Sequence, residues 1–321
     1  MAVYTEVNDA DLARFLSHYD LGRVLALKGI AEGVENSNYF LHTERGNFIL
    51  TLYEKRVAER DLPFFLGLME HLAGHGLNCP QPVRNLDGEA LGRIAGRPAA
   101  LVTFLDGMWR RNPSVRCCAS AGNALGKLHR AGAGFAGNRA NTMGLEAWPV
   151  LFQESEPHAD ELQPGLAAEI AKELALLAQN WPRHLPRGII HADLFPDNVL
   201  FLDDEVSGLI DFYFACTDQL AYDVAICLNA WCFEPDGSYN ITKALAFLSA
   251  YEGIRRLTAD EAEAFLVLAR GAALRFTLTR LVDWLSVPAN ALVQPKDPRE
   301  YIQKLRFHQQ ARSARELGLL R

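Results

Sequence analysis

The side chains best suited to chemistry are concentrated between residues 191 and 211. Asp193 and Asn198 are five positions apart in a polar loop between two apolar runs, and Asp211 follows thirteen residues later at the end of a further apolar run. A carboxylate can orient an attacking hydroxyl group and accept its proton, and carboxylate and amide oxygens are ligands that Mg²⁺ prefers. Phosphoryl transfer from ATP to a hydroxyl group needs such a carboxylate and such magnesium ligands, and these three residues can supply both.

The same residues have a plainer interpretation. Asp and Asn are common in turns and at helix caps because their side chains bond to nearby backbone groups. A lone Asp193 would favour that interpretation. Two spaced motifs joined by a predicted hairpin, with its turn at Asp203 and Asp204, favour a catalytic site.

Two short motifs carry a resemblance to a known superfamily. The segment HADLFPDN, from His191 to Asn198, resembles the catalytic loop H-x-D-x-x-x-x-N of eukaryotic-like kinases. Asp211-Phe212-Tyr213 is similar to their D-F-G element, with Tyr in place of Gly. Within that superfamily, the chain resembles the aminoglycoside and choline phosphotransferases. The resemblance rests on these motifs, on the run from Leu125 to His129 and on Asp106-Gly107, where the chain would pass from one lobe to the other.

The resemblance implies a role for each matching residue. Asp193 would be the catalytic base, and Asn198 and Asp211 would be the magnesium ligands. His191 would belong to the catalytic loop as a support that fixes its shape rather than as a reacting group. Asp223 matches a structural Asp of the same group.

The pattern departs from protein kinases in the predicted nucleotide-binding half. Protein kinases hold the phosphates with a strand Lys that pairs with a helical Glu, but the Lys position here is Thr51 and the Glu position lies near Phe65. The loss of both is self-consistent, since a buried Glu without its cation would be costly. It also leaves open a second class of function, a catalytically silent protein that binds nucleotides and regulates.

Backbone amides of the loop 29–37 are the candidates for the missing phosphate clamp. Gly33, with the side chains of Asn36 and Ser37, could form an anion-binding turn, and Thr51 is counted with them because it occupies the lysine position. The loop lacks a G-x-G-x-x-G pattern, so an ordinary hairpin connection is the alternative. By analogy with the hinge between lobes in this group, we expect the adenine ring against the main chain of Thr103, Phe104, Leu105 and Asp106.

Longer strings narrow the choice of acceptor. The segments 33–39, 50–54, 191–201 and 208–233 together resemble the homoserine kinases of this fold. That resemblance implies phosphorylation of the side-chain hydroxyl group of L-homoserine to O-phospho-L-homoserine, a step of threonine biosynthesis. The catalytic motif itself does not name the acceptor, so choline, an aminoglycoside and methylthioribose stay open.

A homoserine site must neutralise a carboxylate and an ammonium group while it leaves the hydroxyl group free near Asp193. Arginine suits a carboxylate because two of its N–H groups can bond to it at once. Arg275 and Arg280, in an otherwise apolar predicted helix, are the candidates. Either could instead lie along apolar surface or pair with an acid such as Asp283.

The elements that must position these residues predict an α+β fold with two lobes, and the resemblance implies that the lobes are arranged as in protein kinases. Residues 1–104 are expected to form a β-rich, nucleotide-binding lobe built on a small antiparallel sheet. Its predicted elements are a hairpin of 37–41 and 47–53, a helix over 57–75, and an extended pair at 90–94 and 99–105.

Residues 105–321 are expected to form the helical catalytic and substrate lobe. Asn112-Pro113 predicts the start of a helix that runs to about His129, and Thr258-x-x-Glu261 is a capping box that opens a long helix. Strand, loop, strand, turn and strand from 188 to 211 interrupt the helices. Further helices are expected near 160–180, 218–231, 240–252 and 298–315. A cleft between the lobes is the natural ligand site.

Composition excludes several other classes of protein. The chain has 321 residues, 49% of them hydrophobic, so it can bury a large core. A formal net charge of -7 argues against a protein that coats nucleic acid or anionic lipid. No secretory signal and no membrane span are recognisable, and the six cysteines lack metal-site spacing, so we expect a cytoplasmic protein with reduced, buried thiols. ATP and one small-molecule acceptor are the expected partners, and the oligomeric state is not predicted.

Overall fold

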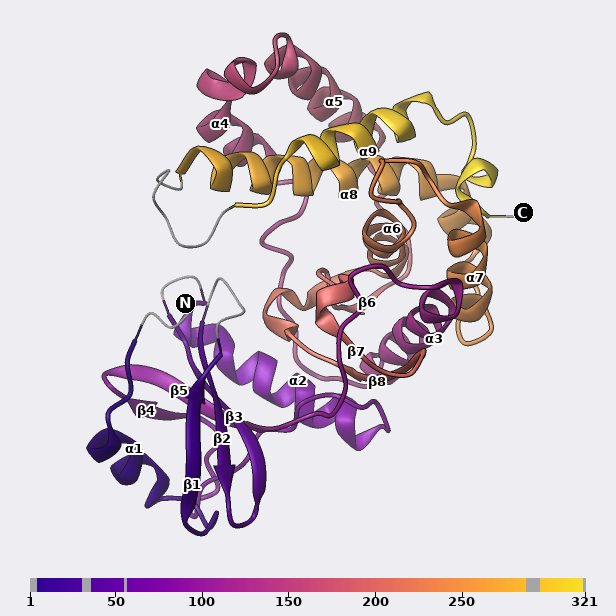
Figure 1. Cartoon of the computed structure of the whole chain (residues 1–321). Helices are drawn as coiled ribbons and strands as arrows, with labels where there is room; N and C mark the ends of the chain where they lie inside the picture. The colour runs from indigo at the N-terminus through magenta and orange to yellow at the C-terminus, as the bar shows by residue number, and fades with distance from the viewer. Residues whose placement is uncertain (1–4, 31–35, 55–56, 287–294, 320–321) are drawn as a thin grey trace.

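The computed structural model describes residues 5–30, 36–54, 57–286 and 295–319. Within these residues a small lobe built on an antiparallel sheet adjoins a larger, mainly helical lobe, as Figure 1 shows. This arrangement confirms the predicted α+β class. The placement of the lobe boundary between residues 104 and 105 stays a prediction.

The sheet of the small lobe has the strand order β1-β2-β3-β5-β4. Its strands are β1 (Val24–Gly29), β2 (Ser37–Thr43), β3 (Gly46–Leu52), β4 (Gly92–Ile94) and β5 (Arg97–Thr103). β2 and β3 pair without interruption from Ser37 opposite Leu52 to Thr43 opposite Gly46, which confirms the predicted hairpin. Gly46 has φ of 132°, a conformation that Gly adopts without steric cost and that closes the turn.

A helix covers each face of this sheet, because alternate side chains of a strand point to opposite faces. Leu50 and Leu101 pack with Phe15 of α1 (Asp9–Leu16) in one buried cluster. Val102 belongs to the other cluster, with α2 (Leu62–Gly74). The helix predicted from residue 57 begins only at Leu62, after a 3-10 turn η1 (Glu59–Asp61).

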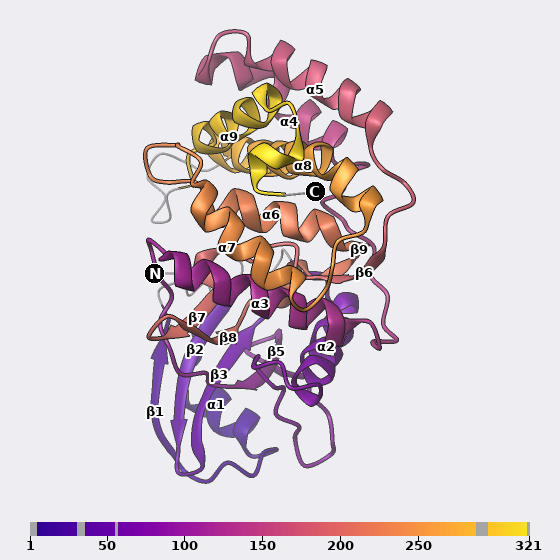
Figure 2. The same cartoon turned by 90° about the vertical axis from the view of Figure 1, so that its right-hand side faces the viewer.

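The large lobe is built from helices that pack along one another, with α3 against α7 and with α8 against α4, α6 and α9 (Figure 2). These helices are α3 (Val115–Gly132), α4 (Trp148–Leu162), α5 (Leu166–Asn180), α6 (Leu220–Trp231), α7 (Ile241–Glu252), α8 (Ala259–Ser286) and α9 (Arg299–Gln310), followed by η4 (Ala314–Leu317). The approach of α3 to α7 requires Gly122, since a Cβ atom there would lie 2.2 Å from the carbonyl oxygen of Phe247.

Two short strand pairs, separate from the sheet of the small lobe, carry the polar loop. β6 (Arg187–Ile190) pairs with β9 (Cys216–Gln219), and β7 (Val199–Leu202) pairs with β8 (Glu205–Leu209). The structure therefore confirms the predicted order of strand, loop, strand, turn and strand from 188 to 211. The strand β9 was not predicted. Met108, in the segment that connects the lobes, forms a bridge with Phe201 of β7.

The ends of several helices test the sequence signals. The capping box is confirmed, because Thr258 N donates to Glu261 Oε2 at 2.8 Å and Glu261 N donates to Thr258 Oγ1 at 3.2 Å. The predicted start at Asn112 is wrong: Ser114 is the N-cap of α3, and its Oγ accepts from Cys117 N. The helix expected near 160–180 is α5, preceded by the end of α4, and α9 stops at Gln310 rather than near residue 315.

Composition also led to expectations about the cysteines and about membrane spans. The six cysteines are free and buried, as predicted. Among the residues described, no helix combines the length and the apolarity that a bilayer crossing would need.

Candidate active site

Asp193 and Asn198 lie at opposite ends of one loop that follows β6 and ends in the 3-10 turn η2 (Pro196–Asn198). Asn198 Nδ2 donates to the Asp193 carbonyl oxygen at 2.8 Å and to Asp193 Oδ2 at 3.1 Å. The two residues are thus brought together as predicted. Since the amide nitrogen is engaged, the Asn198 amide oxygen, which has no hydrogen bond from any described residue, is the atom left to bind a ligand.

A buried carboxylate fixes the backbone at the start of this loop. Asp223, which is fully buried in α6, accepts hydrogen bonds from His191 N at 2.8 Å, Ala192 N at 2.9 Å and His129 Nε2 at 3.1 Å. Ala192 has φ of 63°, a conformation that is strained for a residue with a Cβ atom. Burial alone would raise the pKa of Asp223, but the bonds from His129 and the neighbouring His191 outweigh it and hold the pKa below its ordinary value.

His191 ties the loop to the strand that precedes Asp211. Its Nδ1 accepts from Asp193 N at 3.3 Å, and its Nε2 lies 3.0 Å from the Ile210 carbonyl oxygen. These contacts fit the neutral ring with its proton on Nε2. Burial lowers the pKa of His191, against smaller opposing effects that include the charge of Asp223. The imidazole therefore holds the two motifs together as an uncharged group.

Asp211 follows β8 and precedes the 3-10 turn η3 (Phe212–Phe214). It is exposed, and its φ of 63° turns the chain sharply after the strand. Its charge acts on Asp193, whose pKa it helps to raise. Two carboxylates and one amide oxygen are a donor set for a hard cation such as Mg²⁺. No group of three or more His, Cys, Asp and Glu side chains suited to a metal occurs among the residues described.

The acidity of Asp193 reflects its surroundings. Burial is the main cause that raises its pKa to about 8, and the negative charges of Asp211 and Asp197 add to the effect. The cations Arg275 and Lys296 oppose it. General bases work best when their pKa lies near the working pH. A carboxylate with these neighbours is suited to take a proton from a hydroxyl group.

An aromatic cluster occupies the place where a protein kinase would have its Lys and Glu pair. Thr51 is buried in β3, and its Oγ1 donates to Asn38 Oδ1 at 2.8 Å. Phe65 is buried in α2 with its ring 5.6 Å from that of Tyr213, and the hydroxyl groups of Tyr213 and Tyr53 lie 3.2 Å apart. Tyr213, at the position of the glycine in the D-F-G element, therefore packs against Phe65 of α2 and Tyr53.

The proposed phosphate clamp is only partly described. Asn36 and Ser37 are buried, with Asn36 Oδ1 accepting from Glu54 N at 3.3 Å and Ser37 Oγ donating to Glu54 Oε1 at 2.9 Å. Gly33 lies outside the described residues. Contacts of these residues and of Thr51 with phosphate stay predictions.

The segment predicted to meet adenine leaves β5 and crosses to the large lobe. Thr103 N donates to the Gln81 carbonyl oxygen at 2.9 Å, and the Asp106 carbonyl oxygen accepts from Ser207 Oγ at 2.7 Å. Phe104 is exposed, with its ring 5.3 Å from that of Phe40. Within the part of the chain that the structure describes, Leu105 N has no hydrogen-bond acceptor. A main-chain donor is therefore available for a base, and adenine binding here stays a prediction.

The two arginines proposed for the substrate carboxylate are both bonded within the protein. Arg275 is 2% exposed, and its Nη1 donates to the Ala192 carbonyl oxygen at 2.5 Å. Arg280 is 7% exposed and pairs through Nη1 with Glu300 Oε2 at 2.6 Å. Arg275 thus holds the backbone of the catalytic loop at Ala192, and Arg280 connects α8 to α9. Binding of the substrate carboxylate by either arginine stays a prediction, and these hydrogen bonds within the protein do not support it.

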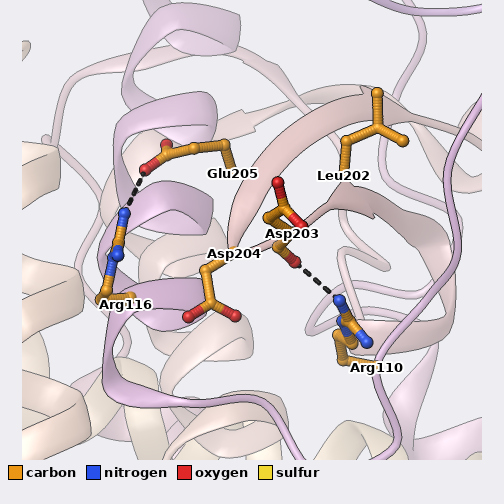
Figure 3. A pocket seen from close by; sticks show the side chains of 6 residues that line it. All are labelled: Arg110, Arg116, Leu202, Asp203, Asp204 and Glu205. Carbon is orange, nitrogen blue, oxygen red and sulfur yellow. Dashed lines mark hydrogen bonds and ion pairs between the residues drawn. The ribbon is translucent and has the colours of Figure 1, made fainter.

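A surface hollow of ≈ 560 Å³ lies at the other end of the β7–β8 hairpin (Figure 3). It is lined by Arg110, Arg116, Leu202, Asp203, Asp204 and Glu205. Arg110 donates to the Asp203 carbonyl oxygen at 2.8 Å, and Arg116 lies 3.4 Å from Glu205. Because β7 begins directly after Asn198, this turn is separated from the catalytic loop by the length of the strand. The hollow is not part of the candidate active site.

Two charged residues near Asp193 were not predicted. Lys296 and Asp197 form an ion pair of 3.1 Å at the edge of the catalytic loop. Asp197 is inside the recognised motif and could have been singled out from its position. Lys296 lies 99 residues further along the chain and has no sequence signal that links it to the loop.

The fold and the site define a phosphotransferase with the two-lobed architecture of the protein kinases. The model of the phosphotransferase enzyme family matches residues 26–257, more than half of the chain. Solved structures with this fold include an amicoumacin kinase, with a TM-score of 0.68, 15% identity and coverage of 94% of this chain and 92% of that one. A microcompartment-associated aminopropanol kinase has a TM-score of 0.67, 16% identity and coverage of 97% and 99%.

Curated relatives give a finer assignment. A homoserine kinase of Beijerinckia indica is 65% identical over 321 residues, which covers 100% of both chains. A homoserine kinase of Methylocella silvestris is 66% identical over 320 residues, again with 100% coverage of both. The chain belongs to the phosphotransferase enzyme family and, within it, to the homoserine kinases. Membership of a kinase family implies that it uses ATP.

Proposed function

We propose that the chain is a magnesium-dependent homoserine kinase, which transfers the γ-phosphoryl group of ATP to the side-chain hydroxyl group of L-homoserine. The product would be O-phospho-L-homoserine, which places the protein in threonine biosynthesis. The observation that carries the acceptor is identity of 60–66% with homoserine kinases along the whole chain. A cytoplasmic location stays a prediction.

The contacts of the catalytic loop support separate roles for Asp193, Asn198 and Asp211. Asp193 would accept the proton of the homoserine hydroxyl group, and its raised pKa suits that task. Asn198 and Asp211 would hold Mg²⁺, which when bound neutralises charge on the phosphates. The Asn198 amide nitrogen holds the Asp193 carboxylate, so base and metal ligand are positioned by one hydrogen bond.

A second set of residues would position the first. Asp223, His191 and Arg275 hold the loop through the main-chain atoms of residues 191–193 and 210. None of these contacts consumes an oxygen of Asp193. Since phosphoryl transfer depends mainly on alignment and on charge stabilisation, such a rigid loop is the contribution that the protein can make.

The experiment that tests the proposed function is an acceptor panel. Purified protein is incubated with ATP and Mg²⁺, and release of ADP is followed with L-homoserine, choline or kanamycin. We expect turnover with L-homoserine that exceeds the rate without acceptor, and no such increase with choline or kanamycin. Preference for another acceptor would refute the assignment, and nucleotide binding without turnover on any acceptor would favour a regulator.

A further inference from the structure

The acceptor presents a specific electrostatic problem, and this inference rests on the proposed function. L-homoserine has a carboxylate and an ammonium group on one carbon atom, separated by two methylene groups from the carbon-bound hydroxyl that reacts. A site for it needs one cation and one anion close to each other and close to the catalytic base. Either charge left without a partner on binding would reduce affinity.

The buried arginines are poorly placed to supply the cation. Arg275 and Arg280 are 2% and 7% exposed and are bonded to Ala192 and Glu300. A carboxylate could reach Arg280 only by displacing Glu300, and the Arg275 side chain, whose buried Nε has no hydrogen-bond partner in the described part of the chain, is enclosed by the protein.

The ion pair of Lys296 and Asp197 meets the requirement without such a cost. Lys296 Nζ lies 3.1 Å from Asp197 Oδ2, and the two side chains are 55% and 46% exposed. Asp197 is four residues after Asp193 in the catalytic loop, and Lys296 Nζ lies 5.3 Å from the ring centroid of Phe195 in the same loop. An exposed ion pair is worth at most about 1 kcal/mol, so it can open readily.

The ion pair also lies close to the catalytic base along the loop. Asp197 directly precedes Asn198, whose Nδ2 donates to Asp193 Oδ2 at 3.1 Å. The loop from 191 to 198 has no Lys or Arg of its own, so the cation at this edge comes from the segment before α9. An acceptor whose two charges lie at this edge can direct its hydroxyl group towards Asp193.

We propose that Lys296 and Asp197 form the acceptor subsite, in which Lys296 binds the α-carboxylate and Asp197 binds the α-ammonium group of the amino acid. In the absence of acceptor the two side chains pair with each other. When the acceptor binds, its carboxylate replaces Asp197 as the partner of Lys296, and its ammonium group replaces Lys296 as the partner of Asp197. The net charge of the site is unchanged, and the pair selects for a zwitterion rather than for a simple alcohol.

The test combines two variants with two truncated acceptors. Lys296→Gln removes the cation, and 3-aminopropan-1-ol is homoserine without its carboxylate. Asp197→Asn removes the anion, and 4-hydroxybutanoate is homoserine without its ammonium group. Each analogue is measured as a substrate or, where its turnover is too slow, as a competitive inhibitor of homoserine phosphorylation. Lys172→Gln, an exposed change on α5, is the matched control.

Each variant should lower kcat/KM for L-homoserine by roughly 10- to 100-fold, the range for one charge-assisted hydrogen bond, with the KM for ATP unchanged. Lys296→Gln should leave 3-aminopropan-1-ol within about threefold of the wild-type value, and Asp197→Asn should do the same for 4-hydroxybutanoate. Equal losses on homoserine and on the matching analogue, or no loss, would overturn the inference while the proposed function stands. A wild-type protein that does not phosphorylate homoserine would refute both.

Discussion

Asp223 offers the most informative test of how the catalytic loop is held. The substitution Asp223→Asn keeps the size of the side chain and replaces one oxygen and the charge with an amide group. In the native protein Oδ2 accepts from His191 N and from His129 Nε2, while Oδ1 accepts from Ala192 N. An asparagine can offer only one oxygen to these three donors.

The expected cost follows from that arrangement. In the better of the two orientations, the amide oxygen serves His191 and His129 while the NH₂ group faces Ala192 N. One buried donor is then left unpaired, at about 1–3 kcal/mol, and the two remaining bonds lose their charge assistance. The free energy of unfolding should therefore fall by about 2–4 kcal/mol. Since a domain typically has 5–15 kcal/mol, the variant should still fold.

The assay is urea unfolding followed by circular dichroism, together with kcat for L-homoserine. Because a loop moved by about 1 Å can lose two orders of magnitude in rate, kcat should fall by roughly 10- to 100-fold. The control Asp87→Asn makes the same change in an exposed turn and should alter stability by less than about 0.5 kcal/mol. A loss below about 1 kcal/mol for Asp223→Asn, combined with wild-type kcat, would refute the reasoning.

Two further substitutions test separate parts of the account. Asp211→Ala should abolish the magnesium-dependent part of ATP-analogue affinity measured by calorimetry, because it removes a carboxylate ligand, and unchanged affinity with Mg²⁺ would contradict that role. Burial, followed by the charges of Lys304 and Arg270, lowers the pKa of His308 to about 3 from its ordinary value near 6.5. The unfolded chain therefore takes up a proton first as the pH falls, so stability present above about pH 6.5 is lost towards pH 3. Between pH 7.5 and 5.5 this loss should be about 1.4 kcal/mol larger in the wild type than in His308→Gln, measured by urea unfolding, and equal losses would show that His308 is not responsible.

The parts of the site that were predictable depend on short-range relations in the sequence. Asp193 and Asn198 are five residues apart and bond directly, so their spacing carried the geometry. The capping box of Thr258 and Glu261 and the β2–β3 hairpin are local in the same sense. Such elements are specified by neighbouring residues whatever the rest of the chain does.

The parts that were not predictable depend on contacts between distant segments. Arg275 bonds to a carbonyl group 83 residues away, and Lys296 pairs with an acid 99 residues away. An isolated basic residue has the same appearance in the sequence whether it binds a substrate or the backbone. β1 was missed for a different reason, since most of its side chains are exposed and it lacks the alternation by which strands are recognised.

The most direct test of the central claim is the turnover of Asp193→Asn with L-homoserine, ATP and Mg²⁺. The substitution preserves shape and removes the base, so the account predicts that kcat falls by a factor on the order of 10² or more while the KM for ATP stays close to the wild-type value. Turnover near that of the wild type would contradict the assignment of Asp193, and with it the mechanism proposed for this loop.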